Sequence, residues 1–483
     1  MTRKIRNILF LVLAVLFLIA TPLTILYSLG WRFDWETKKI VQTGVFYFKV
    51  WPKNVQIYLN GKLKKKTDLF FGSSLIENLR PKKYEIEIKK EGFHSWKKTL
   101  EIEGKEVTEA QNIVLIPKNP KFNTVAQGTK NFFFSPDNKK IILEEKLPSP
   151  QPFSLAEPNP STWSLKLLEL NKNIKSHLIN EKDISEKGVQ LINLKFSPDS
   201  KRILLKVEAE GKILYYLLEI NRTPAVLIPL DFLNLAIEDI YFDPLDSENL
   251  FILSPPKNKI GEEGKELSKV DIIKRKISPL PLKDVIAFSI SGNNIYYLSS
   301  SGFLLKSDFS FRQQNSLNLI PFHLDKEKKY KIKVFNSVVF LEESNKDSNV
   351  LYLLNKGAKA FQKFFESIKN FRVSPDSQKV VYFSDYEIWI LFLEKISEFP
   401  QKEAGERLFI SRFSEKISDA FWYTNHYLIF NVGNKIKVAE IDDRDRINIV
   451  DLAEFKKPRI FWANKKLFVL SEENLYVSEE LSP

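Results

Sequence analysis

The sequence predicts an all-β protein with one N-terminal transmembrane helix, a small β-sandwich and a C-terminal β-propeller of eight blades, alternatively seven. Three observations predict this order. The chain opens with a long uncharged apolar run, continues with short stretches that alternate apolar and polar residues, and then repeats one turn phrase between apolar segments. With 43% hydrophobic and 13% aromatic residues in 483, the chain can bury large cores.

The composition also excludes several kinds of site. The chain has no cysteine, so disulfides, thiolate metal sites and a cysteine nucleophile are excluded. Its four histidines are far apart and form no HExxH pair, so no metal site is expected; they are His94, His177, His323 and His426. The formal charge of +13 is spread along the chain. It indicates a basic, solvated surface that suits anionic partners, and no nucleic acid is expected.

Residues 8–29 form the apolar run, which holds 22 residues without a charge. A helix of this length spans about 33 Å, enough for the hydrocarbon core of a bilayer. A cleaved signal peptide has a shorter apolar stretch, so we expect an uncleaved signal anchor, although Ser28-Leu29-Gly30 offers an alternative cleavage site. The basic tail, residues 1–7, then stays in the cytoplasm and the bulk of the chain lies outside a plasma membrane crossed once.

Residues 44–117 follow a linker at 30–43 and alternate apolar and polar side chains. Val55, Ile57 and Leu59 share one face, and Asn60-Gly61 is a hairpin signal. Short strands at this spacing predict a small antiparallel sandwich.

This segment resembles the PEGA domain family. The resemblance depends on "VWPKNVQIYLNGK" at 50–62, Thr67, "IENLRPKKYEIEIKKEGF" at 76–93 and Trp96. The tetrad that gives the family its name reads PKNV at 52–55 here, which changes turn and core positions only. The resemblance implies an extracytoplasmic β-sandwich beside a membrane anchor, with a surface or wall-binding role and no catalytic residues.

A basic cluster follows the hairpin signal in "GKLKKKT" at 61–67. One interpretation is contact with an anionic wall or surface polymer or with lipid head groups; the other is a solvated turn. The candidate surface-binding residues are Lys62, Lys64, Lys65 and Lys66.

The repeated phrase is a turn between two apolar strands. In "F-S-P-D", Ser and Pro suit the first two positions of a type I turn, and the Asp carboxylate can accept nearby N–H groups. We therefore predict three hairpin corners with a structural role, at Ser135, Pro136 and Asp137, at Ser197, Pro198 and Asp199, and at Ser374, Pro375 and Asp376.

Looser copies of the phrase extend the repeat to eight units. Their anchor residues are Phe134, Phe196, Phe242, Phe288, Phe335, Val373, Phe421 and Phe461. A unit of about 40–50 residues with several short strands is typical of a β-propeller. These phrases resemble the WD-like repeats of TolB-like propellers, a resemblance that implies the fold and leaves the activity open.

The propeller, residues 121–483, is predicted to close through its two ends. The last unit has only three strands, so 122–127 should pair beside 474–478 as the fourth. Two insertions, 145–163 and 255–269, fall between the second and third strands of their units. Antiparallel alternation places them on the face opposite the corners, where they serve either recognition or as spacers.

No catalytic, cofactor-binding or metal-binding motif is found. The acidic "DDRDR" at 442–446 lacks calcium-site spacing and is interpreted as a solvated turn. We expect a non-catalytic, membrane-anchored extracytoplasmic scaffold of the cell envelope that recognises a protein or a wall polymer through propeller loops and the PEGA-like domain. The alternatives are a propeller-type hydrolase or lyase with a central-channel site for polysaccharide or peptide, and an accessory to a membrane machine.

Overall fold

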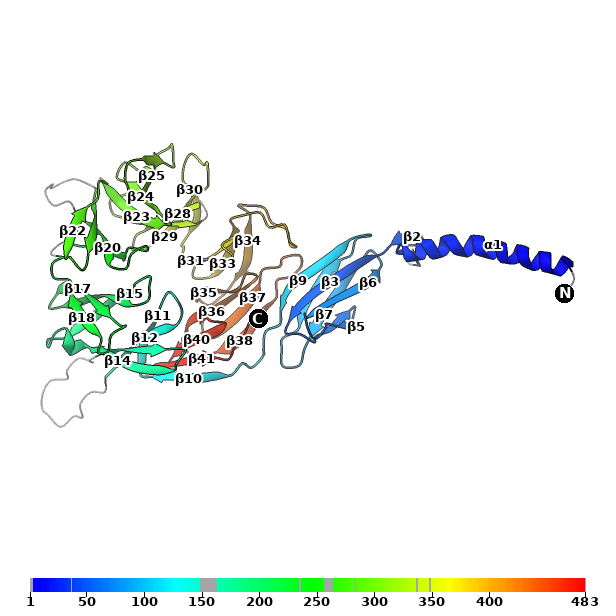
Figure 1. Cartoon of the computed structure of the whole chain (residues 1–483), viewed down its shortest axis with the longest axis horizontal. Helices are drawn as coiled ribbons and strands as arrows, with labels where there is room; N and C mark the ends of the chain where they lie inside the picture. The colour runs from blue at the N-terminus through cyan, green and yellow to red at the C-terminus, as the bar shows by residue number, and fades with distance from the viewer. Residues whose placement is uncertain are drawn as a thin grey trace.

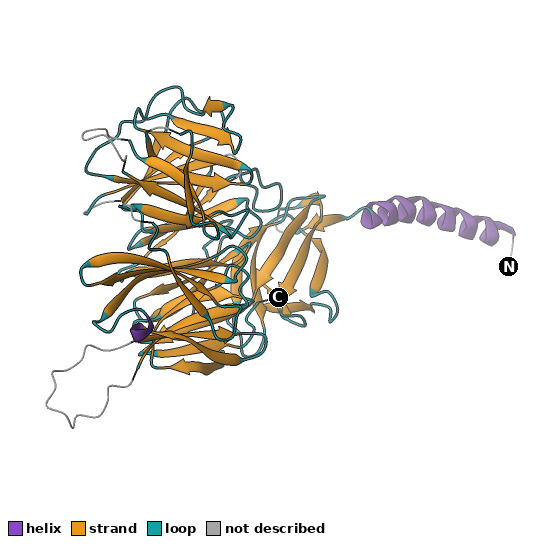
Figure 2. Cartoon of the chain, turned by 60° about the vertical axis from the view of Figure 1, so that its left-hand side comes forward, coloured by secondary structure: helices purple, strands orange, loops and turns teal. Residues whose placement is uncertain are grey.

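The computed structural model describes residues 3–35, 37–147, 163–233, 236–255, 264–282, 284–335, 338–346 and 349–482. A helix, a β-sandwich and a ring of β-sheets follow one another along the long axis of the molecule (Figure 1). Apart from α1 and the short 3₁₀ helix η1 (Glu181–Asp183), the regular structure drawn is β-strand (Figure 2).

The first element is α1 (Arg3–Ser28). Its stretch Ile5–Ser28 has a mean hydropathy of 2.8, and no part of that stretch is buried against the rest of the chain. By length and composition this helix can cross a bilayer.

Residues 30–43, expected to be a linker, contain a hairpin of β1 (Trp31–Asp34) and β2 (Lys39–Gln42). The Arg32 guanidinium donates to the Tyr27 carbonyl at the end of the helix and, over 2.8 Å, to Asn78 Oδ1 of the sandwich. Arg80 of the sandwich forms an ion pair of 3.1 Å with Asp34. The hairpin therefore ties the helix to the sandwich, which local alternation alone did not predict.

The sandwich consists of two sheets over one core. One has the order β6 (Ser73–Leu79), β3 (Gly44–Trp51), β9 (Val107–Val114); the other has the order β5 (Lys62–Lys66), β4 (Gln56–Leu59), β7 (Lys83–Lys89), β8 (Trp96–Glu101). Strand β9 pairs parallel with β3, so the prediction of an all-antiparallel sandwich is wrong. The reason is that the chain leaves the four-stranded sheet after β8 and enters the three-stranded sheet beside β3, running in the same direction as β3.

Beyond residue 120, the described chain forms eight four-stranded antiparallel sheets around a common centre (Figure 1). The first four blades are β11 (Thr129–Phe134), β12 (Lys140–Lys146), β13 (Trp163–Glu169), β14 (Ile174–Asn180); β15 (Val189–Phe196), β16 (Arg202–Ala209), β17 (Lys212–Glu219), β18 (Val226–Pro229); β19 (Asp239–Phe242), β20 (Asn249–Ser254), β21 (Glu266–Asp271), β22 (Lys276–Pro279); and β23 (Val285–Ser291), β24 (Asn294–Ser299), β25 (Leu304–Asp308), β26 (Gln314–Ser316).

The remaining blades are β27 (Lys329–Phe335), β28 (Val338–Ser344), β29 (Asn349–Leu354), β30 (Gln362–Glu366); β31 (Asn370–Val373), β32 (Lys379–Phe383), β33 (Glu387–Phe392), β34 (Arg407–Arg412); β35 (Ile417–Thr424), β36 (Tyr427–Val432), β37 (Lys435–Glu440), β38 (Ile449–Glu454); and β39 (Arg459–Ala463), β40 (Lys466–Ser471), β41 (Asn474–Ser478), β10 (Phe122–Gln127). The fold class is therefore the predicted one, with eight blades rather than seven.

The second strand of each blade is apolar on both faces because it packs against two neighbouring blades. In β12, Ile142 belongs to the core shared with the next blade, which includes Ile203. Ile141 and Leu143 belong to the core shared with the last blade, which includes Phe468. Continuous apolar runs thus arise from radial stacking of sheets.

The ring closes as predicted: β10 pairs antiparallel with β41, with Phe122 opposite Ser478. The two insertions also join the second and third strands of their blades, from β12 to β13 and from β20 to β21. Residues 148–162 and 256–263 within them lie outside the described residues.

Candidate functional site

The three Ser-Pro-Asp corners are structural turns in which the serine is buried and the proline is exposed. In the first, the Ser135 hydroxyl donates to Asp137 Oδ1 over 2.6 Å and accepts the Lys140 N–H over 3.0 Å. Burial alone would raise the pKa of Asp137, but hydrogen bonds from Ser135 and the Lys139 N–H outweigh it, so that pKa lies below its ordinary value. The corners at Ser197 and Ser374 repeat the same hydrogen bonds.

The corners also connect blade to blade. The Asp137 N–H donates to Ser200 Oγ of the second blade over 3.4 Å, and the Lys140 ammonium donates to the Ser200 carbonyl over 2.8 Å. The Asp376 N–H likewise donates to Asn425 Oδ1 of the seventh blade over 3.2 Å. Hydrogen bonds between turns therefore connect neighbouring blades on this face of the ring. The turn motif alone did not indicate these contacts.

The sandwich joins the ring through a buried ion pair. Lys98 Nζ lies 2.8 Å from Glu440 Oε1, with the two side chains only 0% and 3% exposed. Glu440 Oε2 accepts the Trp96 indole N–H over 2.7 Å, and Asn448 donates its backbone and amide N–H groups to Oε1. Burial raises the pKa of Glu440, although Lys98 and these donors oppose that shift.

The loop that follows Glu440 contacts the sandwich along its length. Asp445 Oδ2 accepts the Thr99 N–H over 2.6 Å, and Arg444 donates to the Glu109 carbonyl over 2.6 Å while pairing with Asp442. The interpretation of residues 442–446 as a solvated turn is therefore wrong. The local pattern of charges does not reveal these contacts, because the surface that residues 442–446 meet lies more than 300 positions earlier in the sequence.

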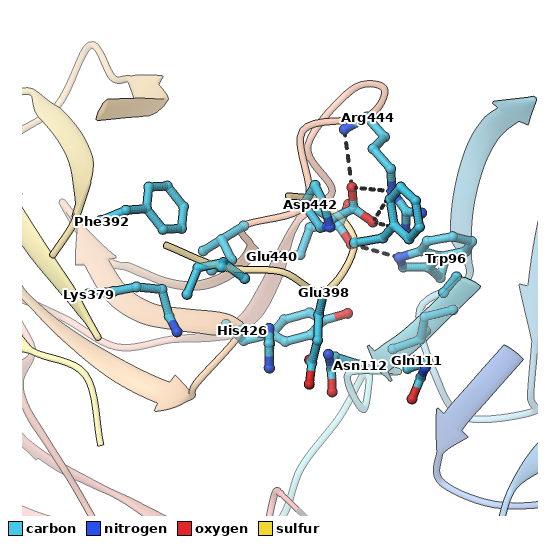
Figure 3. A pocket seen from close by; sticks show the side chains of 17 residues that line it. Trp96, Gln111, Asn112, Lys379, Phe392, Glu398, His426, Glu440, Asp442 and Arg444 are labelled. Atoms are coloured by element: carbon cyan, nitrogen blue, oxygen red, sulfur yellow. Dashed lines mark hydrogen bonds and ion pairs between the residues drawn. The ribbon is translucent and has the colours of Figure 1, made fainter. Parts of the chain in front are cut away.

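A small cavity lies in this junction (Figure 3). It is lined by Trp96 and Gln111 from the sandwich and by His426, Glu398 and Asp442 from the ring, among others. Its free volume of about 50 Å³ has room for a few water molecules and is too small for a substrate. The junction therefore acts structurally and fixes the ring on the sandwich.

The ring residues at the junction lie in connections on one face of the ring. His426 lies between the first and second strands of the seventh blade, and residues 441–448 connect its third and fourth strands. In an antiparallel blade these connections share one face, which is the face of the Ser-Pro-Asp corners. The connections between second and third strands, and those between successive blades, lie on the opposite face.

A well-anchored loop on that opposite face, residues 317–328, joins the fourth blade to the fifth; we call it the ring loop. Asn318 is fully buried; its amide donates to the carbonyls of Gly302 and Ile320, and its oxygen accepts the Leu304 N–H over 2.7 Å. Gly302 has φ +83°, and a Cβ there would lie 2.1 Å from the Phe322 carbonyl oxygen. The ring loop is thus held in one conformation.

The ring loop presents apolar side chains to solvent beside a large cavity. Leu319 is 69% exposed and Ile320 is 56% exposed, and both backbone N–H groups donate to the Lys359 carbonyl. The adjacent cavity has a volume of about 550 Å³ and mixes apolar with polar lining residues, including Ile286, Ser300, Ser301, Phe322, His323 and Lys328. This size and lining suit a peptide segment or a small molecule.

A satisfied carboxylate lies under this cavity. Glu343, in β28, accepts from Lys328 Nζ over 2.9 Å and from the Tyr330 hydroxyl over 3.2 Å. Burial raises the pKa of Tyr330, and Glu343 adds to that shift. Because Lys328 and Tyr330 line the cavity, their hydrogen bonds to Glu343 hold this part of its wall in place.

The predicted basic cluster forms the edge strand β5, in which every residue is exposed. Lys62, Lys64, Lys65 and Lys66 therefore extend along one edge of the sandwich rather than gathering at the hairpin tip. Lys65 Nζ donates to the Leu75 carbonyl of β6 over 2.9 Å. The structure does not bring these lysines together with the Ser-Pro-Asp corners.

Sequence reasoning missed the junction residues. One signal was present: Trp96, Lys98 and Leu100 occupy the buried positions of β8, so a lysine stood where the alternation demanded an apolar residue. Glu440 similarly ends a buried run in β37. A charge on a core face indicates a buried partner.

No family model matches the chain, and no curated protein matches it either. Solved structures do match. They include Hsv2 of Kluyveromyces lactis (10% identity, 68% of this chain and 99% of that chain, TM-score 0.37), YCF48 from Cyanidioschyzon merolae (11%, 61% and 96%, 0.36) and the computationally designed protein Ika8 (9%, 73% and 96%, 0.39).

All three TM-scores are below 0.5, so these likenesses carry no argument about function. The propeller assignment depends instead on the strand order of the eight sheets. The resemblance of residues 44–117 to the PEGA family gains no support from the comparison with family models.

Proposed function

We propose that this protein is a non-catalytic scaffold of the cell envelope, anchored in the plasma membrane, that binds a protein partner through the free face of its ring. The observation that carries the proposal is the ring loop. Its exposed Leu319 and Ile320 belong to the connection between the fourth and fifth blades, beside a cavity of about 550 Å³ that is lined from connections opposite the corners. Exposed apolar side chains on a well-anchored loop are typical of a recognition surface.

In this proposal α1 is an uncleaved signal anchor. Arg3, Lys4 and Arg6 precede the apolar run and lie on the cytoplasmic side, so that the sandwich and the ring lie outside. The hairpin β1–β2 then holds the sandwich against the end of the membrane helix through Arg32 and Asp34.

The sandwich acts as a PEGA-like stalk. Its buried bridge to the ring sets the position of the ring relative to the anchor, and its strand β5 exposes four lysines along one edge. The ring is a TolB-like propeller, in which the corners stabilise the fold and the loops bind the partner protein.

The test is site-specific photo-crosslinking from the full-length protein in intact cells. A crosslinker at Ile320 should give a protein adduct, and the captured protein, once purified, should bind the wild-type chain and lose at least tenfold in affinity to the variant Leu319→Ser/Ile320→Ser. The matched control position is Leu245, which is 59% exposed and lies between β19 and β20 on the corner face.

Two results would overturn the proposal. One is an adduct that forms equally from Leu245 and Ile320, or from neither position. The other is turnover of a polysaccharide or peptide by the purified chain, which would favour the hydrolase or lyase alternative.

A further inference from the structure

Three consecutive apolar side chains project from the sandwich into solvent. Leu69, Phe70 and Phe71 are 66%, 79% and 77% exposed in the complete structure, and we call them the apolar loop. Single exposed apolar residues are common on protein surfaces, but a contiguous group with two phenylalanines marks an interaction site.

The apolar loop is held rigidly. Asp68 Oδ1 accepts the N–H groups of Phe70 and Phe71. Asp68 Oδ2 accepts the backbone N–H and the hydroxyl of Ser73, and both of these distances are 2.7 Å. These donors hold the pKa of Asp68 well below its ordinary value. Gly72 has φ +69°, and a Cβ there would lie 2.5 Å from the Val50 carbonyl oxygen. Because the loop is already ordered, binding through it costs little conformational entropy.

Lysines border the apolar loop on both sides. Lys65 and Lys66 precede it on β5, Lys49 lies opposite Ser73 in the pairing of β3 with β6, and the Lys53 side chain lies beside Gly72. None of these four lysines forms an ion pair within the described part of the chain. Against these four lysines stands one carboxylate, Asp68, whose oxygens accept from the loop itself, so the surface around the loop is positive on balance.

The position of the loop separates it from the bilayer that α1 can cross. Strand β3 begins at Gly44, next to the hairpin that docks on the helix, and the apolar loop lies at the other end, where Gly72 accepts the Val50 N–H. Six residues of extended strand place it about 20 Å farther from the helix than the near end of the sandwich. This distance favours a protein partner over the lipid surface.

We infer that the apolar loop is a second docking surface, which fits a partner protein with an apolar groove rimmed by carboxylates. Phe70 and Phe71 would fill the groove, while Lys49, Lys53, Lys65 and Lys66 would face its acidic rim. This inference rests on the proposed scaffold function and adds a second surface to it, distinct from the ring loop.

The test uses the full-length protein in intact cells with a photo-crosslinker at Phe70. Val107 is the matched control position, since it is an apolar residue that is 47% exposed but lies at the helix-proximal end of the sandwich, opposite Val45. We expect an adduct with a different protein from Phe70 only, and mass spectrometry should place the crosslink in a segment that carries apolar residues flanked by Asp or Glu.

Binding measurements on the captured partner then test the chemistry. Phe70→Ser/Phe71→Ser should weaken binding tenfold or more, Lys65→Glu/Lys66→Glu should weaken it and remove its salt dependence, and Val107→Ser should leave it unchanged. Circular dichroism of each variant confirms that the sandwich is still folded.

An adduct with lipid, an adduct with a second copy of this chain, or no adduct beyond that of Val107 would each overturn the inference. So would binding that is insensitive to Phe70→Ser/Phe71→Ser. If crosslinks from Ile320 persist in those cases, the scaffold function stands and only the second surface is refuted.

Discussion

Lys98 Nζ and Glu440 Oε1 lie 2.8 Å apart, and they join the sandwich to the ring in a site closed to solvent. The ammonium also donates to the carbonyls of Asp442 over 2.7 Å and Arg446 over 3.1 Å, so all its donors have acceptors. A charge pair of this kind imposes geometry, because neither partner tolerates burial alone. The ring and the sandwich therefore form one unit.

Removing the cation should be strongly destabilising. Lys98→Met leaves Glu440 buried with no opposite charge, and we expect a loss of about 3–5 kcal/mol in the free energy of unfolding of the joined unit. Calorimetry of the full-length protein should show the single transition separating into one for the sandwich and one for the ring.

The neighbouring lysine is the control for this experiment. Lys97 has a side chain that is 57% exposed and pairs with Glu87 on the surface, so Lys97→Met should change stability by less than about 1 kcal/mol. Equal effects of the two substitutions would contradict the role given to the buried pair.

Closure of the ring should control the stability of all its blades. Leu475 in β41 is fully buried, and Leu475→Ala should cost about 2–5 kcal/mol. Deleting residues 474–483 removes the strand between β10 and β40, so we expect the ring to become sensitive to proteolysis throughout. Glu473→Ala, on the surface beside β41, is the matched control, and an unchanged melting temperature of the deletion variant would refute closure.

Acidification should weaken the junction through His426. Burial and the nearby Lys379 lower its pKa from 6.5 to about 4, although Asp376 and Asp442 oppose that shift. In the unfolded chain the imidazole takes up a proton near pH 6.5, whereas in the folded chain it stays neutral down to about pH 4. Its contribution to stability is therefore complete above pH 6.5 and is lost as the pH falls toward 4.

Chemical denaturation at pH 7.5 and pH 5 measures this effect. The difference in unfolding free energy attributable to His426 should be about 2 kcal/mol. His426→Gln should remove this difference and leave a separate, smaller dependence from His94, whose pKa burial also lowers. The same pH dependence in wild type and in His426→Gln would contradict this assignment.

The Ser-Pro-Asp corners should matter for stability and leave recognition unaffected. Ser197 is fully buried and accepts the Arg202 N–H over 2.9 Å, so Ser197→Ala leaves that donor unsatisfied and should cost about 1–3 kcal/mol. Ser310→Ala changes an exposed turn and should stay within about 0.5 kcal/mol. A measurable loss of partner binding at the temperature where Ser197→Ala is folded would show that the corner does more than turn the chain.

The N-terminal segment should be retained in the mature protein. The uncharged run of 22 residues is longer than the apolar region of a signal peptide, so a tag fused before Met1 should remain on the membrane-bound protein. Intact-mass measurement of protein purified from membranes checks this. A mass that begins near residue 30 would show cleavage and remove the anchor.

Most of the fold is encoded locally. The corners recur between apolar segments, and consecutive buried residues such as Ile141, Ile142 and Leu143 require sheets on both sides. The missing strand of the last unit and the spare segment Phe122–Gln127 then predicted how the ring closes. Such features follow from turn chemistry and from the period of apolar residues, which depend on neighbours in the sequence.

The junction and the conformation of the ring loop were decided by tertiary structure. Lys98 meets Glu440, Arg444 meets the Glu109 carbonyl, and Asn318 fixes the ring loop under Gly302 only because folding brings distant strands together. The sequence by itself determined the blades, the apolar N-terminal helix and the corners, since hydrophobic periodicity and turn preferences act over a few residues. Only the folded chain decided which charges are buried, because a partner across an interface, and not the local pattern, compensates for the loss of water.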